Sequence, residues 1–184
     1  PYEKAEVTTH LGIRAIGINP DGMSVSLEGG EELQGSHIVL ATGGYARRLA
    51  LPGANLAGVH VLRNASDVHA IKALAHTGAS VVIIGGGYIG LETAASLRKL
   101  GLKVTLLEAE ERVLARVTGP ELSRFYQRIH TEEGVEILTG ATAAEITGTA
   151  EVSGVILSDG RIIEANLVIV GVGIIPATEL ATEA

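Results

Sequence analysis

The fold of this chain is decided by the stretch Val81-Val82-Ile83-Ile84-Gly85-Gly86-Gly87-Tyr88-Ile89-Gly90-Leu91-Glu92. Four apolar residues lead into a triple glycine, and an amphipathic segment follows it. A second apolar run, Val104-Thr105-Leu106-Leu107, then ends at Glu108. This order predicts a strand, a tight turn, a helix and a second strand, which together form the unit that binds a dinucleotide.

The glycines of this unit have separate physical tasks. Gly85 permits the tight turn, Gly87 leaves the backbone open to a pyrophosphate, and Gly90 lets the helix pack closely on the strand. Free N–H groups at the start of the helix would face the phosphates. Glu108 stands where a carboxylate accepts hydrogen bonds from the adenosine ribose, and its charge would repel a 2′-phosphate.

The sequence predicts nucleotide binding more firmly than it predicts which coenzyme is bound. A glycine pattern alone is a weak signal, but here strand, turn, helix and terminal acid are in register. Glu108 favours NADH. Arg112 and Arg116 follow it closely and could reach the phosphate of NADPH, so the preference for NADH leaves NADPH open.

The composition narrows the classes of partner. The chain has 184 residues, 46% of them apolar, which is ample for a packed core. Only 3% are aromatic, Trp is absent and the net charge is −7, all of which oppose binding to nucleic acid. The apolar runs are too short to span a bilayer, and no basic and then apolar leader opens the sequence, so we expect neither a membrane partner nor export.

Cysteine is absent from the sequence. This excludes disulfides and thiolate clusters within the chain and fits a reducing cytoplasm, where we expect the protein. The six histidines are scattered without the spacing of a metal site. We expect each of them at the surface or at a helix end, and we expect no metal.

The first forty residues are predicted to form short strands and no helix. The expected strands are Ile13 to Ile18, Ser24 to Leu27, and Ile38 to Ala41. They have too little apolar surface to make a core of their own. We therefore expect them to belong to a larger sheet, part of which lies outside this sequence.

Two further helices are predicted on either side of the central unit. The first begins with Ser66 as its N-cap. The second follows the capping-box pattern Thr118-x-x-Glu121. In it, helical spacing is shown by Leu122, Phe125, Tyr126 and Ile129, so its aromatic residues are predicted to be core residues.

The remaining apolar segments predict strands. Val135 to Leu138 is a third strand of parallel type, and Leu167 to Val170 returns to the same sheet. Between them we expect a three-stranded meander made of Ala143 to Thr147, Glu151 to Leu157 and Arg161 to Glu164. The expected fold class is α/β: a Rossmann-like domain with a parallel sheet, helices and a meander, preceded by separate β strands.

Five blocks of sequence occur in a recognisable order. They are Leu40-Ala41-Thr42-Gly43-Gly44, Leu62-Arg63 with Asp67, the central stretch from Val82 to Glu92, Arg112-Val113-Leu114-Ala115-Arg116-Val117, and Val168-Ile169-Val170-Gly171-Val172-Gly173-Ile174-Ile175-Pro176. In this order the chain resembles the FAD-dependent NADH:ferredoxin and rubredoxin reductases of the putidaredoxin reductase type. The first and last blocks also occur in related flavoproteins, including disulfide reductases.

The resemblance implies a domain division and a fragment. Members of that family begin with a glycine-rich FAD motif, carry a later Gly-Asp flavin motif and end in an interface domain, none of which is found here. The chain is therefore similar to the middle of such a protein. Residues 1–45 would be strands of a partial FAD-binding domain, 46–172 the NAD-binding domain, and 173–184 the return segment to the FAD domain.

The resemblance also implies site residues for NAD. The pyrophosphate would be held by Gly87, Tyr88, Ile89 and Gly90, the ribose by Glu108, and the adenine or phosphate side by Arg116; Glu92, Gly171, Val172 and Gly173 would lie near the nicotinamide. Two of these assignments have structural alternatives. Glu92 could simply be an acid in the first helical turn that complements the helix dipole, and the Gly171-Val172-Gly173 segment could be a plain turn at a strand end.

For FAD, the resemblance implies contacts from Thr42, Gly43, Arg47 and Arg63, with the backbone of Ile13 near the adenine. A solvated surface charge is an equal alternative for Arg47, because the neighbouring Arg48 leaves the register open. No residue of this chain is expected to act as an acid, base or nucleophile, since the chemistry would be that of the cofactor.

The function implied by the resemblance is hydride transfer from NADH to flavin, followed by single-electron transfer to an iron–sulfur partner, a ferredoxin or rubredoxin. A disulfide reductase or an NADH oxidase of the same superfamily is an alternative, because its cysteines could lie outside this sequence. A third possibility is an isolated nucleotide-binding module without turnover. We expect this chain on its own to be inactive.

Overall fold

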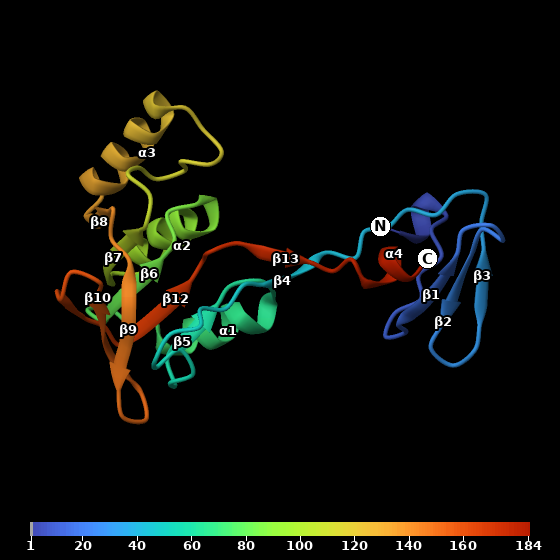
Figure 1. The fold of residues 1–184 in the computed structure, drawn as a ribbon, viewed down its shortest axis with the longest axis horizontal. Coiled ribbons are helices and arrows are strands. Elements are labelled where there is room, and N and C mark those ends of the chain that lie inside the picture. Colours follow the sequence, from blue (N-terminus) through green and yellow to red (C-terminus); the bar gives the residue numbers. More distant parts are fainter. Residues whose placement is uncertain (1) are drawn as a thin grey trace. The chain divides into compact units, whose positions relative to one another are not determined.

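The computed structural model describes residues 2–184, which divide into two compact units. Tyr45–Ile175 form the larger one, here called the major unit, and residues 2–44 with Pro176–Ala184 form the minor unit. The chain thus leaves the minor unit once and returns to it once (Figure 1).

A five-stranded parallel sheet is the centre of the major unit. Its strands, in spatial order, are β5 (Val59–Val61), β12 (Leu167–Val170), β6 (Ser80–Ile84), β7 (Lys103–Glu108) and β8 (Val135–Thr139). In this register Ile84 of β6 lies beside Leu107 of β7 and Val170 of β12. The carboxyl ends of these three strands therefore meet at one edge of the sheet, which confirms the expected Rossmann-like α/β class.

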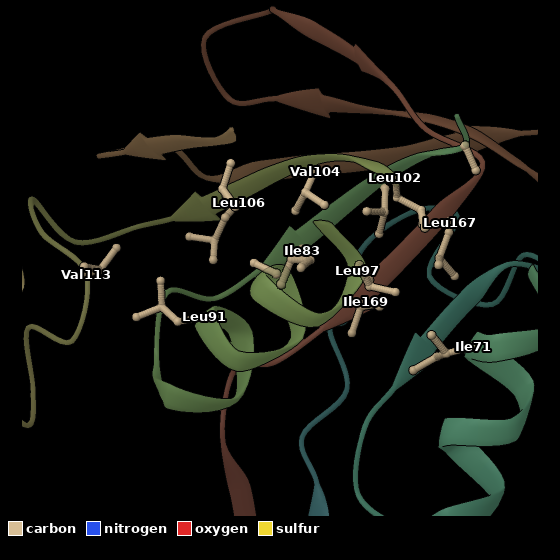
Figure 2. Close-up of a cluster of buried hydrophobic side chains, with 14 of the residues drawn as sticks. Ile71, Ile83, Leu91, Leu97, Leu102, Val104, Leu106, Val113, Leu167 and Ile169 are labelled. Atoms are coloured by element: carbon tan, nitrogen blue, oxygen red, sulfur yellow. The ribbon is translucent and has the colours of Figure 1, made fainter. Parts of the chain in front are cut away.

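Three helices cover one face of this sheet. They are α1 (Ala65–Leu74), α2 (Tyr88–Lys99) and α3 (Pro120–Glu132). Figure 2 shows Leu91 and Leu97 of α2 against Ile83 of β6 and Ile169 of β12. These side chains are almost completely buried, so the dinucleotide-type helix is packed directly on the centre of the sheet.

The predicted meander covers the opposite face. It consists of β9 (Ala143–Gly148), β10 (Val152–Leu157) and β11 (Ile162–Glu164), all antiparallel. Ile146 and Val155 of the meander form a second apolar cluster with Val82 and Val168 of the parallel sheet. Because side chains alternate along a strand, β6 contributes to both clusters and is buried on both faces.

The beginning of α1 differs from the prediction. Asn64, and not Ser66, is the N-cap: its side-chain oxygen accepts the N–H of Asp67 at 3.1 Å, and the Asp67 carboxylate accepts the N–H of Asn64 at 3.0 Å. The Ser66 hydroxyl donates to the Asn64 side chain instead. Asparagine with an acid three residues later makes the reciprocal pair, so the helix begins earlier than expected.

The expectations for α3 were wrong in two respects. Gly119 is its N-cap, with no side-chain cap, and the Thr118 hydroxyl donates to the carbonyl of Leu114 at 3.3 Å. Phe125 is 47% exposed and lies beside the Arg128 guanidinium, so it is not a core residue. Tyr126 is half-buried and packs against the main apolar cluster, so the prediction holds for Tyr126 alone. The two fully buried side chains of this helix, Ser123 and His130, are polar and bond to backbone carbonyls of neighbouring segments.

The minor unit contains an antiparallel sheet of three short strands, β1 (Ala15–Asn19), β2 (Ser24–Leu27) and β3 (Glu32–Gln34). Helix α4 (Glu179–Glu183) packs against β1, and η1 (Glu3–Ala5) is a single 3₁₀ turn. The expected strand from Ile38 to Ala41 is wrong: the segment is not in a sheet, and Val39 is 86% exposed. Its apolar pattern has no strand to pair with among residues 2–184.

Two short strands complete the structure. They are β4 (Gly44–Ala46) and β13 (Ile174–Pro176), which form a two-stranded sheet. Within the described part of the chain, no helix has both the length and the hydropathy needed to cross a bilayer. Residues 2–184 likewise contain no group of three or more His, Asp or Glu side chains placed to hold a metal ion.

Candidate functional site

The candidate site lies at the carboxyl ends of β6, β7 and β12. The backbone continues the sheet for one residue past the strands: Gly85 N–H donates to the carbonyl of Leu107, and Gly171 N–H donates to that of Ile84, each at 2.8 Å. The glycine turn between β6 and α2 is thus anchored on both neighbouring strands. Carboxyl ends of parallel strands are where α/β sheets bind ligands.

Two glycines of this turn are required by the protein itself. Gly85 has a φ of +114°, and a Cβ there would lie 2.5 Å from the carbonyl oxygen of Gly171. A Cβ on Gly90 would collide with the carbonyl oxygen of Gly85. These close approaches bring the first turn of α2 down onto the end of β6, as the glycine spacing predicted.

Gly87 is different, because a Cβ there would meet nothing within 4 Å. Its φ of −78° is open to any residue, so neither sterics nor backbone conformation within this chain calls for glycine. Gly87 is the N-cap of α2, which begins without a side-chain cap. The open space therefore lies at the positive end of the helix dipole, where an anionic group can approach the backbone.

Glu108 forms the second wall of the site. One carboxylate oxygen accepts the N–H of Gly86 at 2.7 Å, and the other accepts the N–H of Glu110 at 2.8 Å. The side chain therefore fixes the glycine turn to the end of β7. Each carboxylate oxygen retains a second lone pair, so the group can still accept hydrogen bonds from a ribose.

The two arginines that follow Glu108 have separate environments. Arg116 is exposed, with 84% of its side chain accessible, and its guanidinium lies 3.4 Å from the Glu110 carboxylate. Arg112 is half-buried and donates to the carbonyls of Ala115 and Thr118 and to the Ser123 hydroxyl, at 2.7 to 2.9 Å. Arg112 thus binds its own loop, and Arg116 is the one that faces solvent.

Glu92 lies in the second turn of α2, whose first turn contains no acid. The alternative interpretation of Glu92 as a first-turn acid is therefore wrong. The residue instead lines an open, mostly apolar groove of about 320 Å³ between α1 and α2, with Leu62, Ile71 and Ile89 among its neighbours.

The segment after β12 returns beside the glycine turn. A Cβ on Gly171 would lie 3.7 Å from the backbone nitrogen of Gly90. Gly173 has a φ of +104°, and its carbonyl accepts the N–H of Arg47 at 2.9 Å. Gly171 is thus brought next to the helix start, together with the glycines of the turn.

The residues expected near FAD are divided between the two units. Ile13, Thr42 and Gly43 belong to the minor unit; Arg47 and Arg63 belong to the major unit. The Thr42 hydroxyl donates to the carbonyl of Ala177 at 2.6 Å, and the carbonyl of Gly43 accepts the Ala177 N–H. The backbone of Arg63 donates to the Asp67 carboxylate just before α1.

Three features of the site were not predicted from the sequence. Leu114 has a φ of +55°, and its N–H donates to the carbonyl of Gly86 at 2.9 Å. His130 places its ring nitrogens 2.9 Å from the carbonyl of Tyr126 and 3.1 Å from that of Leu91 in α2. The third is the set of loop contacts of Arg112. Arg112 and Leu114 belong to one of the five sequence blocks, but the contacts themselves have no periodic signal, because each depends on how distant segments meet.

The shifted acid pKa values lie away from the site. The pKa of Glu121 is lowered by backbone N–H donation at the start of α3 and by Arg124, and that of Asp159 by the backbone and side chain of Arg161.

The site itself offers backbone amides, one carboxylate and one exposed cation. Such a set can bind and orient a dinucleotide, and it contains no Ser-His-Asp or Cys-His arrangement among residues 2–184.

Residues 2–184 match the profile of the pyridine nucleotide-disulphide oxidoreductases. The chain is 44% identical over 170 residues to the ferredoxin reductase subunit of 5,5′-dehydrodivanillate O-demethylase from a Sphingobium species, covering 91% of this chain and 41% of that one. It is 39% identical to the ferredoxin–NAD(+) reductase component of the biphenyl dioxygenase system of Paraburkholderia xenovorans, covering 100% and 45%.

Solved structures give the same picture. The reductase in the covalent putidaredoxin reductase–putidaredoxin complex superposes with a TM-score of 0.87 at 38% identity, covering 98% of this chain and 45% of that one. A NAD-dependent persulfide reductase from A. fulgidus superposes with a TM-score of 0.85 at 28% identity, covering 100% and 35%. The chain thus spans less than half the length of these relatives.

Proposed function

We propose, because the chain belongs to the pyridine nucleotide-disulphide oxidoreductase family, that it is the NAD-binding portion of an FAD-dependent NADH:ferredoxin or rubredoxin reductase. The observation that carries this proposal is the steric difference within the glycine turn. Gly85 and Gly90 are needed to close the turn, whereas Gly87 faces open space at the start of α2. Such a space is what a bound pyrophosphate requires.

The proposed coenzyme lies across the carboxyl ends of β6, β7 and β12. Its pyrophosphate is held at the turn from Gly85 to Gly90, including Tyr88 and Ile89, and its adenosine ribose by Glu108. Arg116 lies on the adenine side. The nicotinamide lies toward Glu92 and the Gly171-Val172-Gly173 segment, which approaches the helix start closely.

FAD is the second proposed cofactor, with Ile13, Thr42, Gly43, Arg47 and Arg63 as its contacts in this chain. When bound, a flavin supplies the chemistry of accepting a hydride and releasing electrons singly. The part of this chain is to bind and orient the hydride donor, because no proton transfer at a side chain is needed. The proposed electron acceptor is an iron–sulfur protein, as the names of the relatives indicate.

The alternatives have weaker support. The ferredoxin, rubredoxin and rhodocoxin reductases among the relatives are 36–44% identical to this chain, whereas a water-forming NADH oxidase at 22% identity shares the fold alone. A disulfide-type reductase stays a second candidate, because the persulfide reductase covers the whole chain at 28% identity. The proposed location is the cytoplasm, because a sequence without cysteine fits a reducing compartment.

The proposal is tested by calorimetric titration of the purified chain with NADH and, in parallel, NADPH. We expect saturable binding of NADH and much weaker binding of NADPH. The absence of binding by either coenzyme would contradict an autonomous NAD site. The absorption spectrum of the purified chain shows whether it retains flavin. We expect a colourless chain that lacks flavin, and a stoichiometric flavin band would contradict that expectation.

A further inference from the structure

We propose that Arg112 is a positioning residue of the coenzyme site: it never touches the nucleotide but fixes the glycine turn through Leu114. This inference rests on the proposed function and adds a residue outside the dinucleotide motif. It follows from a chain of hydrogen bonds that links the loop 109–119 to the backbone of Gly86.

The backbone of Gly86 is held from two directions. Its N–H donates to the Glu108 carboxylate at 2.7 Å, and its carbonyl accepts the N–H of Leu114 at 2.9 Å. A Cβ on Gly86 would also lie 3.1 Å from the Val113 side chain. The middle of the glycine turn is therefore clamped between the end of β7 and the loop 109–119, before any ligand binds.

Leu114 adopts a conformation that it would not take by itself. Its φ of +55° is in the left-handed region, which is unfavourable for residues with a Cβ. The side chain is only 2% exposed and belongs to the main apolar cluster. The left-handed backbone lets one residue bury its side chain and aim its N–H at Gly86, so neighbouring contacts must hold it there.

Arg112 supplies those contacts. Its guanidinium donates to the carbonyl of Ala115 at 2.8 Å, to that of Thr118 at 2.9 Å and to the Ser123 hydroxyl at 2.7 Å. The Ser123 hydroxyl in turn donates to the carbonyl of Val113 at 2.6 Å. Acceptors on both sides of Leu114 are thereby tied to one rigid group.

Arginine is specifically suited to this place. Three acceptors in different directions match the planar fork of a guanidinium, whereas a lysine ammonium is a single point on a flexible stem. The acceptors are two carbonyls and a hydroxyl, so the charge strengthens each bond without competing for the carboxylate of Glu108. Ser123 belongs to α3, and the glycine turn is therefore coupled to that helix as well.

The test compares Arg112→Gln and Arg112→Lys with the wild type and with Arg128→Gln. The control removes an equal charge from the exposed face of α3, where Arg128 pairs with Glu132. Two quantities are measured on the whole chain: amide hydrogen exchange of Leu114 by NMR without coenzyme, and the dissociation constant for NADH. Amides of β12, an interior strand of the parallel sheet, report global stability in the same spectra.

We expect both Arg112 variants to speed exchange at Leu114, leave β12 amides protected, and raise the NADH dissociation constant about tenfold, as for the loss of one strong hydrogen bond. Arg128→Gln should change neither quantity. Unchanged exchange at Leu114, or faster exchange with unchanged NADH affinity, overturns the proposal. Wild-type behaviour of Arg112→Lys would also overturn it, because charge alone would then suffice.

Two further outcomes are distinguishable. If the wild type does not bind NADH, the proposed function fails, while the exchange of Leu114 still decides whether Arg112 holds the turn. If the Arg112 variants do not fold, Ser123→Ala replaces them. It removes one acceptor of Arg112 and the bond to Val113, and the same local increase in exchange is expected.

Discussion

The two units of this protein differ most in how they bury apolar side chains. Among the described residues, every buried apolar side chain except Leu27 lies in the major unit. The minor unit exposes Leu11 and Val39 at 86% each and Ile16 at 54%. The major unit thus has a core of its own on both faces of its sheet, whereas the minor unit is held mainly by backbone pairing of short strands.

The largest effect that separates the units is expected from truncating their buried side chains. Ile83→Ala, at the centre of the major unit, should lower its free energy of unfolding by about 2–5 kcal/mol. Leu27→Ala should cost the minor unit much less, because its surroundings are exposed and can adjust. Amide exchange measured in each unit at increasing urea concentration gives the change in unfolding free energy for each variant. Equal losses of stability in the two units would contradict the comparison.

A second contrast concerns glycines in the two units. Gly90→Ala should destabilise the major unit by about 1–3 kcal/mol, because the added methyl collides with the carbonyl of Gly85. Gly17→Ala in β1 should be tolerated, because its Cβ would meet only Ser26, at 3.7 Å. Thermal unfolding of the two variants checks this. A stable Gly90→Ala chain would mean that the close approach is not required.

A smaller effect, on binding and not on folding, is expected at Gly87. Gly87→Ala should leave stability unchanged, because the methyl enters open space, and should weaken NADH binding about tenfold by obstructing the pyrophosphate. Gly119→Ala is the matched control, since Gly119 is also a helix N-cap in an ordinary conformation. Calorimetry on both variants measures the difference. Equal NADH affinities would remove Gly87 from the site.

The smallest effect is expected at the ribose. Glu108→Gln keeps an oxygen for the Gly86 N–H and removes the charge, so NADH should bind roughly threefold more weakly while NADPH binds better. Glu108→Arg should shift the preference further toward NADPH. Titration with both coenzymes checks this, and unchanged affinities for both would contradict the assignment of Glu108.

Much of the major unit could be predicted from its sequence, because its signals are local. The strand from Leu167 to Val170 is predicted with its observed bounds, and the parallel sheet and meander follow from apolar runs and turn residues. The starts of the helices were harder to predict. Ser66 and Thr118 have the right chemistry for an N-cap, but Asn64 and Gly119 occupy the N-cap positions of α1 and α3.

The remaining errors arise where long-range packing outweighs local pattern. The spacing of Phe125 resembles that of a core residue, yet the buried face of α3 consists of Tyr126 with the polar residues Ser123 and His130, which bond to distant carbonyls. The segment from Ile38 to Ala41 has strand-forming residues but no pairing partner in the described chain. In the site, the motif indicated the glycines and Glu108, while the clamp formed by Leu114 and Arg112 depends on the path of a loop.

The burial of β6 on both faces has a consequence for how the sheet finds its alignment. Val81 and Ile83 enter one apolar cluster and Val82 and Ile84 the other, so a shift by one residue would exchange four similar side chains. The hydrophobic pattern of β6 therefore does little to specify the register of this strand. Gly85 limits the register instead, because a Cβ at that position would lie 2.5 Å from the carbonyl oxygen of Gly171, so a shift that placed Ile84 there would be blocked. The turn of the proposed coenzyme site therefore also restricts how β6 can align with β12.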